Sequence, residues 1–213
     1  AKSIVRTQTH IEAEYSKTWS KNSDYIIKRK PHAVKWSYGE RLMSNLEEKH
    51  RILNELSFWI DILKPKSVLE VGSGSGFNLK ILSERYPISF QGLELTEAGA
   101  KSSEFNIQGS MLAMSFPDNS FDLVFSVTAI EQLPRDYLEA FGEVYRVTRG
   151  YAVFIERFKE GQNLFQRLIM KKRDFFRHSY KEVKKVGFEI ISFSPLPFTK
   201  QKCRFCVLVC KKS

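Results

Sequence analysis

Short apolar runs alternate with amphipathic segments along most of this chain. Runs of a few apolar and β-branched residues predict buried strands, and apolar residues three or four positions apart predict helices. Glycine and proline mark several of the boundaries. The expected strands lie at 67–71, 88–94, 104–108, 121–127, 151–156, 188–194 and 203–210. The expected helices lie within 36–63 and at 76–86, 96–103 and 135–147, and another begins near Ser179.

This alternation predicts an α/β fold with a doubly wound, mostly parallel sheet of seven strands. Helical segments separate most of the strands, as a parallel sheet requires. The last two strands are joined only by a proline-containing loop, which is too short for a helical crossover, so we expect them to pair antiparallel. With 213 residues, the chain has the length of one well-buried domain.

The run 68–77 joins an apolar strand, an acid and a glycine turn. Glu70 is followed by Gly72, Gly74 and Gly76 at alternate positions. Glycines where a strand leads into a helix let backbone N–H groups approach a ligand that a Cβ would exclude. The third glycine comes one residue earlier than in the Gly-x-Gly-x-x-Gly turn of dinucleotide-binding proteins. Because Glu70 would repel a phosphate, the turn favours a ligand with an ammonium group.

Three segments in succession resemble the class I S-adenosylmethionine-dependent methyltransferases. They are the Glu-x-Gly-x-Gly-x-Gly run at 70–76, the strand that ends in Glu94, and the stretch 116–126. The resemblance covers about residues 65–155. It implies a Rossmann-like methyltransferase fold, S-adenosylmethionine as the cofactor and methyl transfer as the reaction. In that family the acid at the end of the second strand holds the ribose hydroxyls, which assigns Glu94 to this contact.

The resemblance also implies which residues surround the cofactor. Ser110 stands where many members have an aspartate that accepts a hydrogen bond from the adenine amino group, and a hydroxyl is the weaker acceptor. The expected cofactor-binding residues are Glu70, Gly72, Ser73, Gly74, Gly76, Glu94, Leu95, Gly109, Ser110, Met111 and Ser126. We expect a single domain over 1–213, with an N-terminal helical cover at 1–64, a cofactor-binding core at 65–155 and a substrate-side segment at 156–213.

Methyl transfer from a sulfonium depends on the alignment of three atoms and needs no recognisable catalytic cluster. A base is required only where the acceptor carries a proton. Glu131, just after the fourth strand, and His178 are the candidate bases. Each also has a structural interpretation. Glu131 suits the N-terminus of a helix, and His178 precedes a capping box that Ser179 and Glu182 could form.

The net charge of +10 is distributed unevenly. Residues 1–66 sum to +5, residues 67–150 to −5 and residues 151–213 to +10. Basic flanks around an acidic core favour an anionic acceptor, although a solvated basic surface gives the same composition. We expect a small molecule, a lipid or a sugar as the acceptor. The alternatives are an RNA methyltransferase of the same fold and a catalytically inactive relative that binds the cofactor. RNA is the alternative and not the first choice, because basic flanks alone are a weak signal for nucleic acid.

The segment 161–177 is both apolar and basic. Leu164, Phe165, Leu168 and Ile169 form an apolar stripe, and Arg167, Lys171 and Arg173 border it. Three interpretations fit this pattern: a lid that borders the acceptor pocket, a helix packed on the domain, and peripheral contact with an anionic membrane surface.

Cys203, Cys206 and Cys210 are the only cysteines of the chain. A structural zinc site needs four ligands and no histidine lies near them, so we expect buried thiols and no metal. No apolar stretch approaches the roughly 20 residues of a membrane-spanning helix. The N-terminus shows no signal-peptide pattern, and we therefore expect a cytoplasmic location.

Overall fold

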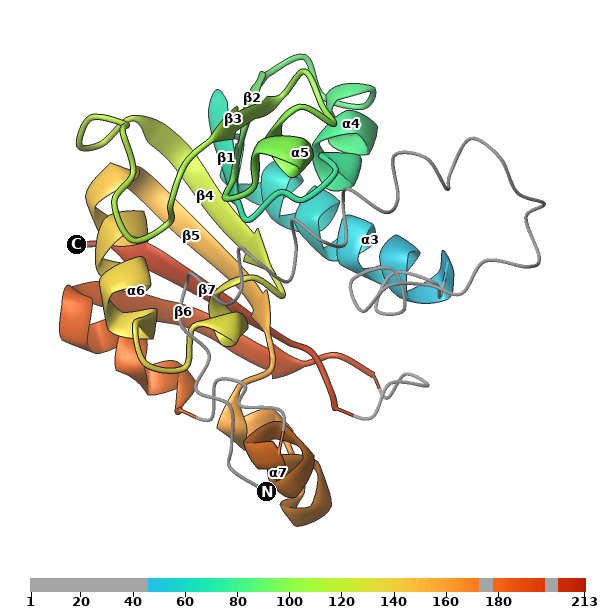
Figure 1. The fold of residues 1–213 in the computed structure, drawn as a ribbon, viewed down its shortest axis with the longest axis vertical. Coiled ribbons are helices and arrows are strands. Elements are labelled where there is room, and N and C mark those ends of the chain that lie inside the picture. The colour runs from blue at the N-terminus through green and yellow to red at the C-terminus, as the bar shows by residue number, and fades with distance from the viewer. Residues whose placement is uncertain (1–45, 173–177, 198–202) are drawn as a thin grey trace.

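A twisted sheet lies at the centre of the computed structural model, which describes residues 46–172, 178–197 and 203–213 (Figure 1). Its strands are β1 (Ser67–Val71), β2 (Ser89–Glu94), β3 (Asn106–Gln108), β4 (Phe121–Val127), β5 (Thr148–Glu156), β6 (Phe188–Pro195) and β7 (Cys206–Lys212). Their order across the sheet is β3-β2-β1-β4-β5-β7-β6. Strands β1 to β5 are parallel, and β7 pairs antiparallel with both β5 and β6. The predicted α/β sheet with antiparallel C-terminal strands is confirmed.

Helices cover both faces of this sheet. The α-helices are α3 (Leu46–Leu63), α4 (Phe77–Ser83), α5 (Glu97–Ala100), α6 (Tyr137–Val147) and α7 (Leu164–Lys172). The 3-10 helices are η1 (Ile130–Gln132), η2 (Lys159–Gly161) and η3 (Tyr180–Val186). Apolar residues of α3 and α4 pack on one face of the sheet, and those of α6 and η3 pack on the other.

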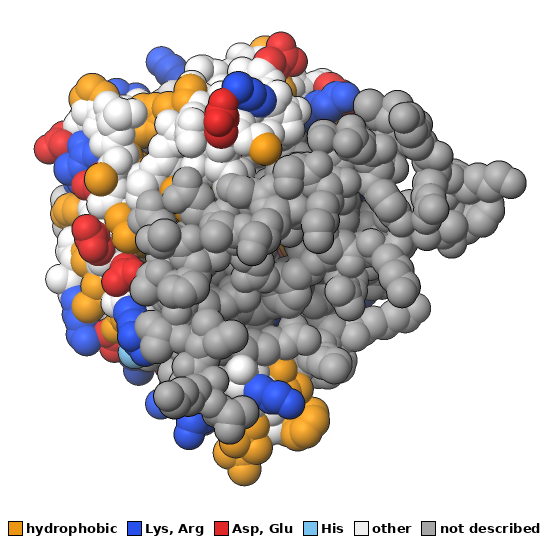
Figure 2. Space-filling model, viewed as in Figure 1, with side chains coloured by type: hydrophobic (Ala, Val, Ile, Leu, Met, Phe, Trp, Pro, Cys, Tyr) orange, Lys and Arg blue, Asp and Glu red, His pale blue; other side chains and the backbone are white. Residues whose placement is uncertain are grey.

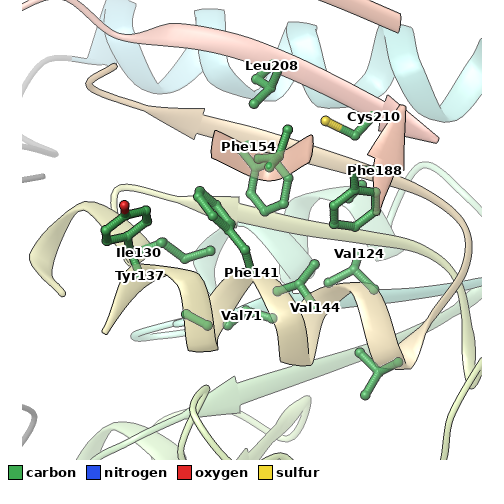
Figure 3. Close-up of a cluster of buried hydrophobic side chains, with 14 of the residues drawn as sticks. Val71, Val124, Ile130, Tyr137, Phe141, Val144, Phe154, Phe188, Leu208 and Cys210 are labelled. Atoms are coloured by element: carbon green, nitrogen blue, oxygen red, sulfur yellow. The ribbon is translucent and has the colours of Figure 1, made fainter. Parts of the chain in front are cut away.

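Strand β4 shows why the central strands are rich in apolar residues. Leu123, Phe125 and Val127 pack in the cluster of α3 and α4, whereas Val124 packs in the cluster of α6. Successive side chains of a strand point to opposite faces, so a strand covered on both sides has apolar residues on both. Figure 3 shows the α6 side, where Phe141, Phe154 and Phe188 meet from a helix and two strands.

Several boundaries differ from the predicted ones. Strand β5 begins at Thr148, and the helix expected near Ser179 is the 3-10 helix η3. Ser179 caps η3 by accepting a hydrogen bond from the Lys181 backbone N–H, whereas the Glu182 carboxylate accepts one from the Tyr137 hydroxyl. The part of the predicted N-terminal helical cover before residue 46 lies outside the described residues. Within the described ranges, no helix combines the length and apolar character that crossing a bilayer requires.

The three cysteines are buried, as predicted. Cys206 and Cys210 lie on β7 in the core under α6, and Cys203 packs against Met170 of α7. Burial raises the pKa of the Cys206 thiol to about 11 and that of Cys210 to about 12. Both thiols are therefore protonated at neutral pH.

Replacing Phe154 should measure how much the α6 side of the core stabilises the fold. The Phe154 ring lies 5.0 Å from the centroid of Phe141 and 6.0 Å from that of Phe188. We expect Phe154→Ala to lower the free energy of unfolding in urea by about 3–5 kcal/mol, since the cavity cannot close. The exposed Phe58 on α3 is the control. Phe58→Ala should change that free energy by less than about 0.5 kcal/mol. Equal effects of the two substitutions would contradict this packing.

Candidate functional site

The turn between β1 and α4 is the centre of the site. Gly72, Gly74 and Gly76 have φ angles of 73°, 55° and 70°, in the left-handed region that favours glycine. A Cβ on Gly72 would lie 2.4 Å from the Cβ of Ala129, and one on Gly76 would lie 2.3 Å from the Ser103 hydroxyl. The turn is thus packed closely against the loop after β4 and the segment before β3, which leave no space for a side chain at Gly72 or Gly76.

Asn106, the first residue of β3, stabilises this turn through three hydrogen bonds. Its Oδ1 accepts a hydrogen bond from the Ser73 hydroxyl at 2.7 Å. Its Nδ2 donates to the carbonyl oxygens of Gly74 at 2.8 Å and Gly99 at 3.1 Å. One amide side chain therefore joins the glycine turn to α5. Sequence reasoning did not single out Asn106, and the signal available was a polar residue at the start of a short strand.

Glu94, the last residue of β2, binds the turn from the other side. Its Oε2 accepts a hydrogen bond from the Gly74 backbone N–H at 3.0 Å. Its Oε1 accepts from the backbone N–H of Thr96 at 3.1 Å and from the Thr96 hydroxyl at 2.9 Å. The side chain is buried. Because a carboxylate has about four lone pairs and three of them are used here, Glu94 can accept one further hydrogen bond, at Oε2.

Glu70 is the buried acid with an unsatisfied oxygen. Its Oε1 accepts a hydrogen bond from the Asn78 amide at 2.7 Å, whereas its Oε2 has no partner among the described residues. The residue is 2% exposed. Burial raises the pKa of its carboxyl to about 8; the Asn78 hydrogen bond opposes this shift, and the charge of nearby Glu94 adds to it. A buried carboxylate of this kind is stabilised by a cation placed against its second oxygen.

A third buried glutamate, Glu156 at the end of β5, organises the loop after β4. Its Oε1 accepts hydrogen bonds from the Ser126 hydroxyl and from the backbone N–H groups of Ala129 and Ile130. Its Oε2 accepts from the N–H of Glu131 at 3.2 Å. Burial and the neighbouring charge of Glu131 raise the pKa of the Glu156 carboxyl. The Ser126 hydroxyl thus supports the loop from within, and its contact with the cofactor stays a prediction.

Glu131, one of the two candidate bases, forms a buried ion pair with Arg157. Its Oε2 also accepts a hydrogen bond from the Arg157 backbone N–H at 2.9 Å. The Arg157 guanidinium lies 4.2 Å from the ring centroid of Phe205. Protonating Glu131 would remove the negative charge of this buried ion pair, which is costly. The geometry therefore favours a positioning role for Glu131, and its role as a base stays a prediction.

The first turn after β4 contains a strained residue. Thr128 has a φ angle of 54°, which a β-branched residue rarely adopts. Its backbone N–H donates to the Ile155 carbonyl at 3.0 Å, and its carbonyl accepts from the Gln132 amide at 2.9 Å. Such strain persists where surrounding contacts fix the backbone, and it is concentrated at functional sites.

The segment expected at the adenine lies beside the glycine turn. The Cε of Met111 lies 3.5 Å from the position of a Cβ on Gly72. A Cβ on Gly109 would lie 2.6 Å from Leu93, and the Ser110 hydroxyl accepts a hydrogen bond from the Leu112 N–H at 3.0 Å. Leu95 is partly buried against the core. Met111 therefore borders the turn, as expected of a cofactor contact.

His178, the other candidate base, lies near the start of α6. Its ring stacks on that of Tyr137, with centroids 4.2 Å apart. The Tyr137 hydroxyl donates to Glu182 at 3.1 Å. Burial and this hydrogen bond raise the pKa of Tyr137 to about 12. A catalytic role of His178 stays a prediction.

The sequence matches known methyltransferases over its central part. Residues 69–155 match a family described as a methyltransferase domain. The 2-methyl-6-phytyl-1,4-hydroquinone methyltransferase of Synechocystis is 30% identical over 123 residues, which cover 52% of this chain and 38% of that protein. Ajmaline N-methyltransferase of Rauvolfia serpentina is 31% identical over 104 residues, which cover 43% and 35%. The matched part of the chain spans less than half the length of these relatives.

Solved structures share the whole architecture. Magnesium protoporphyrin IX methyltransferase from Synechocystis, with SAH bound, superposes with a TM-score of 0.71 over 97% of this chain and 100% of that one, at 12% identity. A geranyl diphosphate methyltransferase in complex with SAM superposes with a TM-score of 0.62 over 85% and 93%, at 14% identity. At these identities the likeness is one of fold.

Glu70→Gln should stabilise the protein at alkaline pH. Because the folded-state pKa of about 8 lies above the ordinary 4.5, the folded protein holds an extra proton between these values. The free energy of unfolding should therefore fall as the pH rises from 4.5 to about 8. Glutamine can still accept from Asn78 without carrying a charge. We expect Glu70→Gln to match the wild type near pH 5 and to exceed its stability at pH 8 by about 1–3 kcal/mol.

Urea unfolding across this pH range measures the effect. The exposed Glu104→Gln substitution is the matched control and should leave the pH profile unchanged. If the free energy of unfolding depended on pH in the same way in the wild type and in Glu70→Gln, the pKa of Glu70 would not be raised by burial as described.

Proposed function

This chain carries a class I methyltransferase domain at residues 69–155, and from this premise we propose that it transfers a methyl group from S-adenosylmethionine to a small-molecule acceptor that carries negative charge.

The unsatisfied Oε2 of Glu70 is the observation that carries the proposal. A buried carboxylate at the glycine turn suits the α-ammonium group of S-adenosylmethionine, because the cation would offset the desolvation of the acid. Glu94 would accept a hydrogen bond from the ribose hydroxyls through the remaining acceptor position of its Oε2. The residues present thus fit this cofactor.

The chain contributes to the reaction mainly through positioning. When bound, S-adenosylmethionine supplies an activated methyl group on a positively charged sulfur. Holding the acceptor in line with this group accounts for as much as about 7–11 kcal/mol of the barrier. The hydrogen bonds of Glu156 and the ion pair of Glu131 fix the loop after β4, which borders the turn. Glu131 and His178 are the candidate bases for an acceptor that must lose a proton.

Charge and the named relatives support the choice of acceptor. Residues 151–213 contain 15 Lys and Arg against five acids. Most of these residues follow the carboxyl end of β5, where Glu156 lies. An anionic acceptor is attracted by such a surface. The names of the relatives and solved structures include a hydroquinone, a sterol and geranyl diphosphate, all small molecules. These names favour a small molecule over RNA.

Binding of S-adenosylmethionine should release a proton from Glu70. With a pKa of about 8, the acid is largely protonated at pH 6.5 and must ionise to meet an ammonium group. We expect calorimetry in buffers of different ionisation enthalpy to report the release of about one proton. Glu70→Gln should weaken binding by about 1.5–3 kcal/mol, as for a lost hydrogen bond to a charged group, and should abolish the proton release.

Glu94→Gln provides the comparison. It should weaken binding to a similar extent while retaining proton release, because it replaces the charged acceptor of the ribose hydroxyls by a neutral amide and leaves Glu70 in place. Glu104→Gln should change neither quantity. Binding without proton release in the wild type would remove Glu70 from the ammonium site.

The acceptor can be found with cofactor that carries a labelled methyl group. We expect incubation with a cell extract to transfer label to small molecules that an anion-exchange resin retains, and Glu70→Gln to reduce this transfer at least tenfold, in line with the lost binding energy. Label in RNA would favour the alternative acceptor. Tight cofactor binding without transfer to any fraction would indicate a binding protein that lacks the activity.

A further inference from the structure

Helix α7 exposes large apolar side chains. Leu164 is 76% exposed, Phe165 is 70% exposed and Leu168 is 59% exposed. They account for three of the six exposed large hydrophobic residues in the described part of the chain. Leu164 and Leu168 are one helical turn apart, and Phe165 lies beside them, so the three form one surface. Figure 2 shows hydrophobic and basic side chains together at the end of the molecule where α7 lies in Figure 1.

The opposite side of α7 is fixed to the domain. Gln166 and Met170 are buried, and Met170 packs against Cys203. Asn163 and Gln166 form a reciprocal cap, in which each side-chain oxygen accepts a hydrogen bond from the backbone N–H of the other at 2.9 Å. A helix of nine residues is marginal by itself in water. These contacts therefore hold its apolar surface in place and facing outward.

Basic side chains surround this surface. Lys159, Leu164, Arg167, Leu168, Met170 and Lys171 line a surface pocket of about 250 Å³. Lys172 is also exposed. Arg167 donates to the carbonyl oxygens of Lys159 and Gln162, which hold it at the base of the helix. The acid of this stretch, Glu160, accepts a hydrogen bond from the Tyr180 N–H of η3.

We propose that α7 docks this domain on an anionic membrane surface. An interfacial helix places its apolar residues at the boundary between headgroups and acyl chains, and its Lys and Arg side chains reach the lipid phosphates. Here Leu164, Phe165 and Leu168 would enter that boundary, with Arg167 and Lys171 at its rim. The inference is independent of methyl transfer, since it rests on α7 alone.

A second copy of the chain fits this surface less well. A two-fold interface brings the same patch of both copies together, so the basic groups around α7 would face one another. Like charges at an interface oppose association. An anionic bilayer satisfies the apolar and the basic residues at once. Each basic residue near such a surface strengthens binding about fivefold. A helix this short buries little apolar area, so it needs charge as well as apolar contact to bind.

Vesicle sedimentation tests the proposal. The full chain should bind vesicles of equimolar phosphatidylcholine and phosphatidylglycerol, and should bind much less to phosphatidylcholine alone. Lys171→Gln with Lys172→Gln should weaken binding about 25-fold at low salt. Phe165→Ser with Leu168→Ser should abolish it. Phe58→Ser, which removes a comparably exposed ring from α3, is the matched control and should leave binding unchanged.

Several results would overturn the proposal. They are no binding to the mixed vesicles, equal binding to both vesicle types, and variants of α7 that bind like the wild type. Sedimentation velocity adds another test, since a dimer that Phe165→Ser with Leu168→Ser dissociates would assign α7 to a second copy. Cofactor calorimetry on the same variants should match the wild type, which shows that they are folded. If the wild type did not bind S-adenosylmethionine, the proposed function would be contradicted, but the vesicle result would still support membrane docking by α7.

Discussion

Hydrogen bonds from backbone N–H groups to buried carboxylates hold the site together. The carboxyl ends of parallel strands lead into loops whose N–H groups lack the partners that a sheet provides. Glu94 accepts from the N–H groups of Gly74 and Thr96, and Glu156 accepts from those of three consecutive residues after β4. Without these acceptors the glycine turn and the loop after β4 would have buried donors and no defined shape.

The same buried carboxylates have an energetic cost for the fold. Burial raises the pKa values of Glu70 and Glu156, and each has a second glutamate nearby that adds to the shift. Thr128 adds backbone strain in the loop that Glu156 organises. Acids with raised pKa values lower the folding stability at the pH where they ionise, and a positively charged ligand would offset this cost. Stability and selectivity are thus opposed in the same few residues.

Local pattern was sufficient to predict the succession of strands and helices along the chain, the mostly parallel sheet and the antiparallel pairing of the last two strands. Both faces of the central sheet are buried, so its strands are rich in apolar residues and easily recognised. The glycine turn and Glu94 were also visible, because their signal lies within one strand and one turn. Element ends were predicted less well: β5 starts three residues earlier than expected, and η3 replaces an α-helix.

The supporting residues of the site could not be predicted in this way. Asn106 meets Gly74 across 32 positions, and Glu156 meets Ser126 across 30. Such pairs depend on the register of neighbouring strands, which a single sequence does not specify. The ion pair between Glu131 and Arg157 is of this kind, and it changes the interpretation of an acid that looked suited to a helix N-terminus. Glu156 had one usable signal, its place at the carboxyl end of a strand.

Strand β7 has a consequence for how the chain folds. It is the last of these strands along the chain, yet it lies between β5 and β6 and pairs with both. During synthesis on the ribosome, β5 and β6 must therefore wait with unpaired edges until β7 emerges. Long-range pairing of this kind is slow, and open edges invite association between chains. Until β7 pairs with them, the β5 and β6 edges can therefore associate with other chains.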